Sequence, residues 1–332
     1  MAKMNRKYPE TRLRRLRSHP SLLKITAETT LTVDDLIQPI FIKEGIKSQE
    51  KIDSLPGIFR YSKEGIIEYC KKIMDVGIKA VALFPVIDPS KKDLDGKEAF
   101  NRKNLICTCV QAIKKEIPDL LLIVDVALDP YTPHGHDGIL NESGYVDNDV
   151  SLEVLKKQAL TLADAGADII APSDMMDGRI GIIRNELEAK SFFNTIILSY
   201  AAKYSSKFYG PFREAVQSSS NIGKSNKDSY QMSPHNIDEA LHEVEMDLNE
   251  GADAVMVKPG MPYLDVIKAV KEKFKVPTFA YQVSGEYAML KAAIEKKWLQ
   301  EEVLIESLYS FKRAGTDCIL TYAAEEAAKK LG

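Results

Sequence analysis

Eight short apolar runs recur along the chain, and segments with helical spacing of apolar residues separate most of them. A strand that is buried on both faces reads as a nearly continuous apolar run, whereas a half-exposed strand alternates. The runs occupy residues 36–42, 80–87, 120–126, 167–173, 195–200, 254–258, 276–283 and 316–322. Eight buried strands that alternate with helices indicate a parallel sheet covered on both faces.

The number of strand–helix units favours closure of the sheet into a single (β/α)8 TIM barrel over residues 31–332. An open, doubly wound sheet is the alternative, but no Gly-x-Gly-x-x-Gly sequence follows the first strand. A length of 332 residues is ordinary for one α/β barrel. The helices predicted from the apolar spacing include residues 64–77, 98–116, 151–165, 179–190 and 236–250.

Residues 1–30 precede the first predicted strand, and we expect them to form an N-terminal arm. Residues 1–24 hold eight Lys or Arg against one acidic residue, Glu10, whereas the rest of the chain carries 37 basic and 47 acidic residues. A basic arm on an acidic body suits nucleic acid, a membrane surface or a neighbouring subunit as its partner. Because no interleaved aromatic residues or RNA-binding signature accompany these charges, we favour subunit contacts, with no nucleic acid and no membrane as partner.

The cysteines and the apolar runs bear on the compartment. Cys70, Cys107, Cys109 and Cys318 form no Cys-x-x-Cys pair. No run approaches the ~20 apolar residues that span a bilayer, and the N-terminus lacks the apolar segment of a secretory signal. We therefore expect reduced thiols and a cytoplasmic location.

Two lysines lie where neighbouring predicted strands end. The sixth apolar run leads into Lys258, and a Pro-Gly pair then stops the strand. Burial disfavours the charged form of an amine, so Lys258 is a candidate neutral nucleophile; the alternative is a lysine that extends its ammonium group to solvent. Lys203 follows the fifth run, and two adjacent lysines oppose each other's protonation. Such a pair suits Schiff-base chemistry on a carbonyl substrate.

Other polar side chains gather at the same predicted edge of the barrel, where the chemistry of TIM barrels takes place. The loop after the third strand combines aspartates with His134 and His136; carboxylates prefer Mg²⁺, histidines admit Zn²⁺, and polar loop scaffolding is the alternative. The loop at about 204–232 offers cations that suit a substrate carboxylate, unless it is simply a solvated basic loop. The candidates are Asp125, Asp129, Asp137, Ser173, Asp174, Arg213, Lys227, Ser284 and Tyr322.

Five motifs then follow one another in a recognisable order. They are residues 125–136 (DVALDPYTPHGH), 171–179 (APSDMMDGR), 199–213 (SYAAKYSSKFYGPFR), 257–263 (VKPGMPY) and 282–286 (QVSGE). In these motifs the sequence resembles the 5-aminolevulinate dehydratase (porphobilinogen synthase) family over essentially its whole length. The resemblance implies a hydro-lyase that condenses two 5-aminolevulinate molecules to porphobilinogen with loss of two waters, early in haem, chlorophyll and corrinoid biosynthesis.

The resemblance also assigns roles to residues. The two Schiff-base lysines of the family fall on Lys203 and Lys258. The substrate on Lys258 becomes the propionate side of the pyrrole, and its carboxylate is held by Ser284 and Tyr322. The resemblance places Arg213 and Lys227 on the carboxylate of the substrate that Lys203 holds. An iminium is a better electron sink than a ketone, which eases carbon–carbon bond formation and proton loss.

One departure from the family concerns metals. Zinc-dependent members carry cysteines at the positions of Ala127, Asp129 and Asp137, so the resemblance implies that this chain has no zinc–thiolate site. Asp125, Asp129 and Asp137 instead resemble the aspartate-rich type, which is served by magnesium or a monovalent cation. Glu243 matches the glutamate beside the separate allosteric Mg²⁺ of the family.

The resemblance implies a homo-octamer as well, because the family is typically built from dimers whose N-terminal arms embrace neighbouring barrels. Two rival hypotheses are left open. A class I aldolase shares the barrel and the imine chemistry but needs only one reactive lysine, so trapping of 5-aminolevulinate on Lys203 and Lys258 tells the two apart. A nucleic-acid-binding protein that uses residues 1–24 would lose polynucleotide binding when the arm is deleted.

Overall fold

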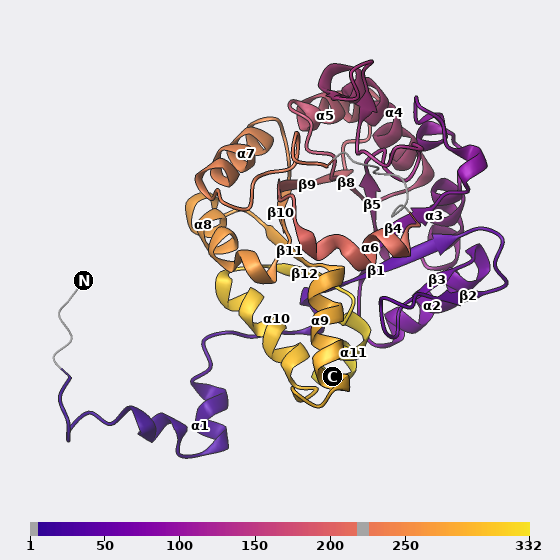
Figure 1. Ribbon diagram of the computed structural model, residues 1–332. Helices are drawn as coiled ribbons and strands as arrows, with labels where there is room; N and C mark the ends of the chain where they lie inside the picture. The colour runs from indigo at the N-terminus through magenta and orange to yellow at the C-terminus, as the bar shows by residue number, and fades with distance from the viewer. Residues whose placement is uncertain (1–5, 218–225) are drawn as a thin grey trace.

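The computed structural model describes residues 6–217 and 226–332. Eight parallel strands close into a barrel with helices around it (Figure 1). In order around the barrel, the strands are β1 (Leu36–Lys43), β4 (Ala80–Val86), β5 (Leu121–Val126), β8 (Ile169–Pro172), β9 (Ile196–Lys203), β10 (Ala254–Lys258), β11 (Thr278–Gln282) and β12 (Cys318–Thr321). β12 pairs with β1 to complete the ring, so the predicted (β/α)8 barrel is confirmed and the open sheet is excluded.

Helices surround the barrel on its outer side. They are α2 (Lys63–Asp75), α3 (Leu105–Glu116), α4 (Asn148–Ala165), α5 (Arg179–Ala189), α7 (Asp238–Asn249), α8 (Leu264–Phe274), α10 (Val303–Ala314) and α11 (Ala324–Leu331). Two further helices, α6 (Gly210–Ala215) and α9 (Ser284–Glu295), pack against each other at the face where the strands end. Figure 1 looks onto this face, and α6 lies across the mouth of the barrel.

The barrel strands separate two hydrophobic cores because successive side chains of a strand point to opposite faces. Inward residues such as Phe41, Phe84 and Met256 fill the barrel. Outward residues such as Val81 and Val255 pack against the helices. Both faces are therefore buried, which is the physical reason that the strands appear as continuous apolar runs in the sequence.

Several short elements were not expected. An antiparallel hairpin of β2 (Gln49–Lys51) and β3 (Phe59–Tyr61) follows β1, and a second pair, β6 (Ile139–Leu140) and β7 (Val146–Asp147), lies in the loop after β5. The helix expected over residues 98–116 was wrong at its start, because Asn104 caps α3 by accepting a hydrogen bond from the Cys107 N–H at 2.8 Å. The short 3-10 helices are η1 (Leu13–Arg17), η2 (Val33–Asp35), η3 (Pro89–Lys91), η4 (Lys97–Phe100), η5 (Lys207–Tyr209) and η6 (Met261–Tyr263).

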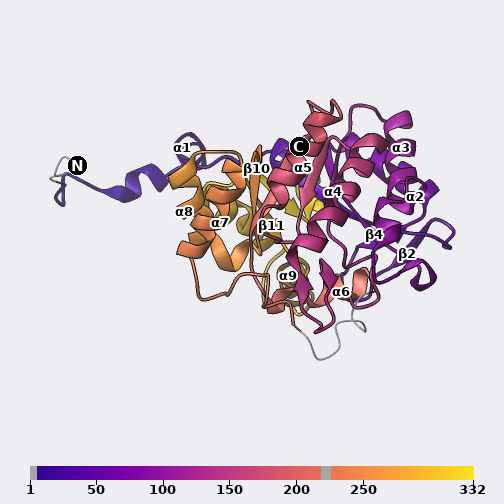
Figure 2. The ribbon, with the colours of Figure 1, turned by 90° about the horizontal axis from the view of Figure 1, so that it is seen from above.

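The N-terminal segment extends away from the barrel, as Figures 1 and 2 show. It contains η1 and α1 (Pro20–Ile25), and neither element has a buried residue. Leu13, Leu16 and Leu23 are exposed there although they are apolar. The segment thus makes no core of its own, which is consistent with the expected arm.

Two findings concern the cysteines and the membrane. All four cysteines are free thiols, and Cys70, Cys107 and Cys109 are buried. Over residues 6–217 and 226–332, no helix combines the length and the apolar character needed to cross a bilayer.

Candidate active site

Lys203 and Lys258 are partners in register on the neighbouring strands β9 and β10. Inward positions on β10 alternate through Ala254 and Met256 to Lys258. On β9 the same alternation from Tyr200 would turn Lys203 outward, but the pairing of the two strands shifts by one residue before Val257. Because one extra residue in a strand reverses the face of every side chain after it, this bulge aims both lysines into the barrel mouth.

Lys258 lies in a mostly aromatic setting. Its side chain is buried, and Tyr209 donates a hydrogen bond to the Lys258 carbonyl oxygen at 3.2 Å. The Lys258 Nζ lies 5.0–5.3 Å from the ring centroids of Tyr200, Tyr209, Phe212 and Tyr281. Burial, with the positive charge of Lys203 as a second cause, lowers the pKa of Lys258 from 10.5 to about 7. A neutral, nucleophilic amine is therefore well populated at neutral pH.

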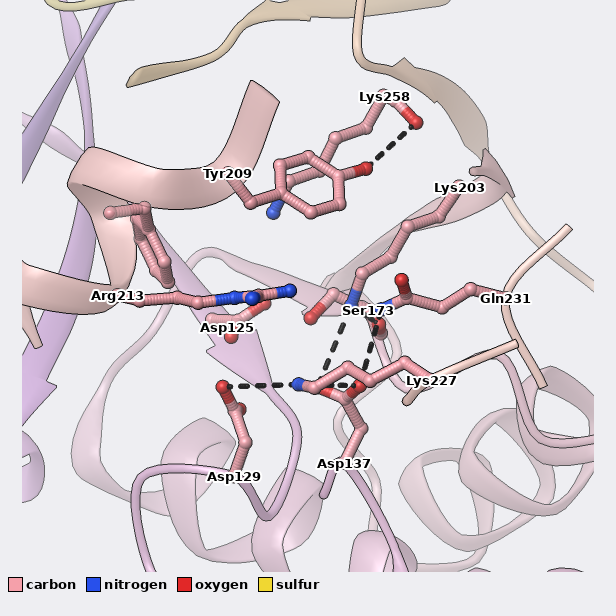
Figure 3. Close-up of a pocket in the computed structure, with 11 residues that line it drawn as sticks. Asp125, Asp129, Asp137, Ser173, Lys203, Tyr209, Arg213, Lys227, Gln231 and Lys258 are labelled. Atoms are coloured by element: carbon pink, nitrogen blue, oxygen red, sulfur yellow. Dashed lines mark hydrogen bonds and ion pairs between the residues drawn. The ribbon is translucent and has the colours of Figure 1, made fainter. Parts of the chain in front are cut away.

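Lys203 lies in a polar and acidic setting only one strand away. Its Nζ donates to the carbonyl oxygen of Ser173, the residue that follows β8. The Asp137 carboxylate lies 3.6 Å from the same nitrogen, and both side chains are buried. The two lysines thus face one cavity from opposite kinds of surroundings, as Figure 3 shows.

Three aspartates and Lys227 form the acidic side of this cavity. Lys227 Nζ lies 3.0 Å from Asp137 Oδ2 and 3.7 Å from Asp129 Oδ2. Burial alone would raise the pKa of Asp137, but the charges of Lys203 and Lys227 outweigh it and hold that pKa well below its usual range. Burial raises the pKa of Asp125 to about 6 despite the two lysines, so Asp125 exchanges its proton close to neutrality.

The predicted candidates separate into those that line the cavity and those that do not. The cavity has a volume of about 40 Å³, which is room for a few water-sized molecules between these side chains. Eight candidates line it: Asp125, Asp129, Asp137, Ser173, Lys203, Arg213, Lys227 and Lys258. Among the described residues, no partner binds the Arg213 guanidinium by hydrogen bond or ion pair, so its donors are available to an anion.

Ser284 and Tyr322 lie outside the cavity lining, next to its aromatic wall. Ser284 Oγ accepts a hydrogen bond from the Phe212 N–H at 2.9 Å. The Tyr322 hydroxyl lies 2.8 Å from that of Tyr281, one of the rings around Lys258. Both hydroxyls are therefore engaged with residues that surround Lys258.

Asp174 also lies outside the lining. It is fully buried, and its Oδ2 is 3.7 Å from Arg179 Nε. Burial raises the pKa of Asp174 to about 6 against the opposing charge of Arg179. Asp174 thus belongs to a buried ion-pair group behind Ser173 rather than to the cavity itself.

The aromatic residues of the site were missed as functional candidates. Tyr200, Phe212 and Tyr281 come from three separate elements, and Tyr209 precedes α6. Gln231 was missed too; its Nε2 donates to Asp137 Oδ2 at 3.4 Å. The available signal was the alternation of Leu198 and Tyr200 on β9, which places the Tyr200 ring on the face that lines the inside of the barrel.

The acidic side does not form a ready-made metal site. Over residues 6–217 and 226–332, no group of three or more His, Cys, Asp or Glu side chains is arranged to hold a metal ion. Asp129 and Asp137 are neutralised by Lys227 instead. Asp125 Oδ1 is buried and lacks a hydrogen-bond partner in the described part of the chain, so it is the oxygen that fits a further cation or a proton.

Glu243 on α7 lies in a different hollow. Asp177, Asp228 and Glu239 line the same hollow. Burial raises the pKa of Glu243 to about 7, and neighbouring carboxylates add to the shift although Arg179 opposes it. These carboxylates do not converge on one point as a group of three, but Mg²⁺ usually keeps several waters and needs only one or two carboxylate ligands.

Comparisons with known proteins agree on one family. Residues 10–330 match the family model described as "Delta-aminolevulinic acid dehydratase". A delta-aminolevulinic acid dehydratase of Bradyrhizobium diazoefficiens is 51% identical over 96% of this chain and 90% of its own length. One of Methanothermus sociabilis is 50% identical over 98% of this chain and 100% of its own length.

A solved structure gives the same answer. The Toxoplasma gondii delta-aminolevulinic acid dehydratase (porphobilinogen synthase), crystallised with its reaction product porphobilinogen, superposes with a TM-score of 0.94. It is 46% identical and covers 96% of this chain and 91% of that protein's chain.

Proposed function

The chain belongs to the delta-aminolevulinic acid dehydratase family, and we propose that Lys203 and Lys258 are the two lysines on which its reaction proceeds. The protein is a porphobilinogen synthase, a lyase that condenses two 5-aminolevulinate molecules to porphobilinogen, in porphyrin biosynthesis. The observation that carries the two-lysine proposal is the in-register pair of buried amines in one cavity.

Lys258 takes the part of the first nucleophile in this proposal. Its neutral amine adds to the ketone carbon of one 5-aminolevulinate, and the resulting carbinolamine loses water to leave a carbon–nitrogen double bond. The lowered pKa of Lys258 supports this step, because only the neutral amine has the required lone pair. Ser284 and Tyr322 hold the carboxylate of this substrate, exchanging their present partners Phe212 N–H and Tyr281 for it.

Lys203 binds the second substrate in the same way, on the acidic side of the cavity. Arg213 and Lys227 hold its carboxylate, since both line the cavity and carry donors suited to a carboxylate. Asp125 receives and returns protons during the two dehydrations, because its pKa of about 6 allows both states near neutrality. Two tethered and clamped substrates meet in a fixed orientation, which lowers the entropic part of the barrier.

The cation and assembly proposals rest on separate residues. Glu243, with Asp177, Asp228 and Glu239 around it, holds an allosteric Mg²⁺, while a magnesium or monovalent cation in the active site lies on the acidic side of the cavity formed by Asp125, Asp129 and Asp137. No zinc–thiolate site is present in this proposal, since Ala127, Asp129 and Asp137 take the positions of the cysteines. Glu243→Gln should abolish stimulation by Mg²⁺ while basal turnover survives; unchanged stimulation would argue against the site.

The exposed arm contacts neighbouring subunits in a homo-octamer. Its unburied apolar side chains support this, because Leu13, Leu16 and Leu23 have no partner within the described chain that buries them. Removal of residues 1–30 should reduce the particle mass measured by analytical ultracentrifugation. An unchanged mass would contradict the role of the arm.

Borohydride trapping tests the two-lysine proposal directly. The enzyme is incubated with 5-aminolevulinate, reduced, digested and mapped by mass spectrometry, and porphobilinogen is measured in parallel. We expect adducts on both Lys203 and Lys258. Lys114→Ala is the matched control and should give the same adducts and the same porphobilinogen formation as wild type. Lys114 is a partly buried lysine that is ion-paired with Asp168 away from the cavity lining. An adduct on one lysine only, with full porphobilinogen synthesis, would reduce the mechanism to a single imine.

A further inference from the structure

The β2–β3 hairpin contacts α6 at its carboxyl-terminal end through one side chain, Arg60. The Arg60 guanidinium donates from Nε to the Ala215 carbonyl oxygen at 2.7 Å and from one terminal nitrogen to the Glu214 carbonyl oxygen at 2.7 Å. Arg60 is only 5% exposed, and more than 150 residues separate it from these partners in sequence. A buried, planar fork that reaches two consecutive carbonyl oxygens fixes both the position and the direction of the helix end.

α6 has particular need of such a partner. The last four carbonyl groups of a helix lack intrahelical donors, and α6 is only six residues long. The Gln217 N–H reaches the Glu214 carbonyl oxygen at 3.0 Å, whereas Arg60 supplies the donor for the Ala215 carbonyl oxygen. A cation at the carboxyl end of a helix also interacts favourably with the partial negative charge there. The same hairpin touches the other end of α6, where Ser54 Oγ donates to the Pro211 carbonyl oxygen at 3.4 Å.

Arg60 is itself held in place. Glu50 is its cross-strand partner in the hairpin and accepts a hydrogen bond from the third nitrogen of the fork at 2.6 Å. Lys43 donates to both oxygens of Glu50 at 2.9 and 3.0 Å. Below these charges, Ile52 and Leu55 are fully buried in the core cluster that includes Ala215. The hairpin is thus anchored before it reaches α6.

α6 carries two residues of the active-site cavity, Phe212 and Arg213. Phe212 is additionally fixed from the other side, because its N–H donates to Ser284 Oγ. Arg213 lies directly before Glu214 and Ala215, whose carbonyl groups Arg60 binds. A shift of this helix end therefore moves the Arg213 guanidinium more than it moves Phe212.

We propose that Arg60 is a positioning residue, which holds the end of α6 so that Arg213 meets the carboxylate of the substrate on Lys203. The inference rests on the proposed role of Arg213. Arg60 touches no substrate; it acts through the backbone of α6. Loss of the two hydrogen bonds from Arg60 to α6 therefore weakens binding of that substrate's carboxylate and leaves the chemistry of the two lysine amines unchanged.

The test compares Arg60→Gln with wild type by borohydride trapping, resolved by lysine. We expect the 5-aminolevulinate concentration for half-maximal trapping to rise roughly tenfold on Lys203 and to change by less than about threefold on Lys258. Arg60→Lys keeps the charge but reaches only one carbonyl group, so its half-maximal concentration on Lys203 should lie between those of wild type and Arg60→Gln. It also replaces Arg60→Gln in the test if that variant does not fold. The matched control is Arg184→Gln, since Arg184 also donates to carbonyl groups, those of Gly251 and Thr195, away from the cavity lining.

A second probe separates positioning from general loosening of the site. 1-Aminobutan-2-one keeps the amine and the ketone of the substrate but has no carboxylate, so its trapping on Lys203 should be the same in Arg60→Gln and wild type. Equal weakening for both compounds, equal weakening on both lysines, or an effect matched by Arg184→Gln would overturn the inference. If wild type itself forms no adducts or no porphobilinogen, the proposed function fails and this inference fails with it.

Discussion

The two sides of the active-site cavity surround a buried lysine with opposite kinds of side chain. Lys258 is surrounded by four aromatic rings and depends on desolvation, which removes its proton near neutrality. Lys203 is surrounded by a carbonyl oxygen and the Asp137 carboxylate, which compensate a positive charge. Two amines on adjacent strands thus differ in readiness to react because of their neighbours and not because of their depth, since both are nearly buried.

This difference suggests an order of events. The amine that is neutral in the free enzyme can add to a ketone at once, whereas an amine held by a carbonyl oxygen and a carboxylate must first leave these partners. Lys258 is therefore the lysine that we expect to bind substrate first.

The largest expected effect is loss of turnover in either lysine variant. Lys258→Met and Lys203→Met should each lower kcat by about 10⁴-fold, because a covalent step cannot be replaced by binding alone. Steady-state porphobilinogen formation measures this, with Lys114→Met as control. If one variant keeps more than a tenth of wild-type turnover, the two sides are not both catalytic and the comparison fails.

The same two variants should change stability in opposite directions. Removing the buried amine of Lys258 should raise the free energy of unfolding at pH 7 by on the order of 3 kcal/mol, since its pKa lies far below the ordinary 10.5. Removing Lys203 leaves buried carboxylates with less compensation and should lower it by about 2 kcal/mol. Denaturant titration monitored by circular dichroism gives both values.

The pH dependence of the Lys258 effect follows from the sign of its shift. The unfolded lysine keeps its proton up to its ordinary pKa of 10.5, whereas the folded one releases it at about 7. The unfolded state therefore binds more protons between these values, and the cost of burying Lys258 is full below pH 7 and disappears towards pH 10.5. The gain in Lys258→Met should decline over the same interval; a gain that is constant with pH would show that packing, not desolvation, is responsible.

A third prediction concerns the coupling between the two sides. Lys203→Met removes the charge that is the second cause of the low Lys258 pKa, so that pKa should rise by about one unit. The rate of borohydride trapping on Lys258, measured from pH 5.5 to 9, reports it. Trapping at pH 6 should fall roughly tenfold in the variant, while the plateau at high pH stays unchanged. If the midpoint of the pH dependence of trapping on Lys258 does not move, the aromatic side alone lowers the Lys258 pKa.

Much of this architecture could be predicted from the sequence, because the signals for it are local. Eight apolar runs gave the eight barrel strands, and the family motifs placed eight candidates that line one cavity. Barrel closure followed from the number of strands, since a parallel sheet with helices on both faces has few other solutions.

What could not be predicted depends on pairing between distant segments. Strand β9 was expected to end near Tyr200, but it continues through two alanines to Lys203, because pairing with β10 outweighs their weak strand propensity. The bulge that turns Lys203 inward has no local sequence signature. The contacts of Ser284 and Arg60 with α6 likewise appear only when distant loops meet at the mouth of the barrel.

The smallest expected effect isolates the aromatic side itself. Ring faces stabilise a nearby cation by about 0.5–1 kcal/mol each, so they oppose the desolvation that deprotonates Lys258. Phe212→Leu keeps an apolar side chain of similar size but removes one ring, 5.3 Å from Lys258 Nζ. The Lys258 pKa should therefore fall by a few tenths, and trapping on Lys258 at pH 6 should rise about twofold. Phe274→Leu, which removes a ring beside the exposed Lys273, is the control and should leave this titration unchanged. A midpoint that moves upward instead would show that Phe212 acts mainly by keeping water from the amine, in which case the aromatic side works through exclusion of solvent and its rings contribute little as cation partners.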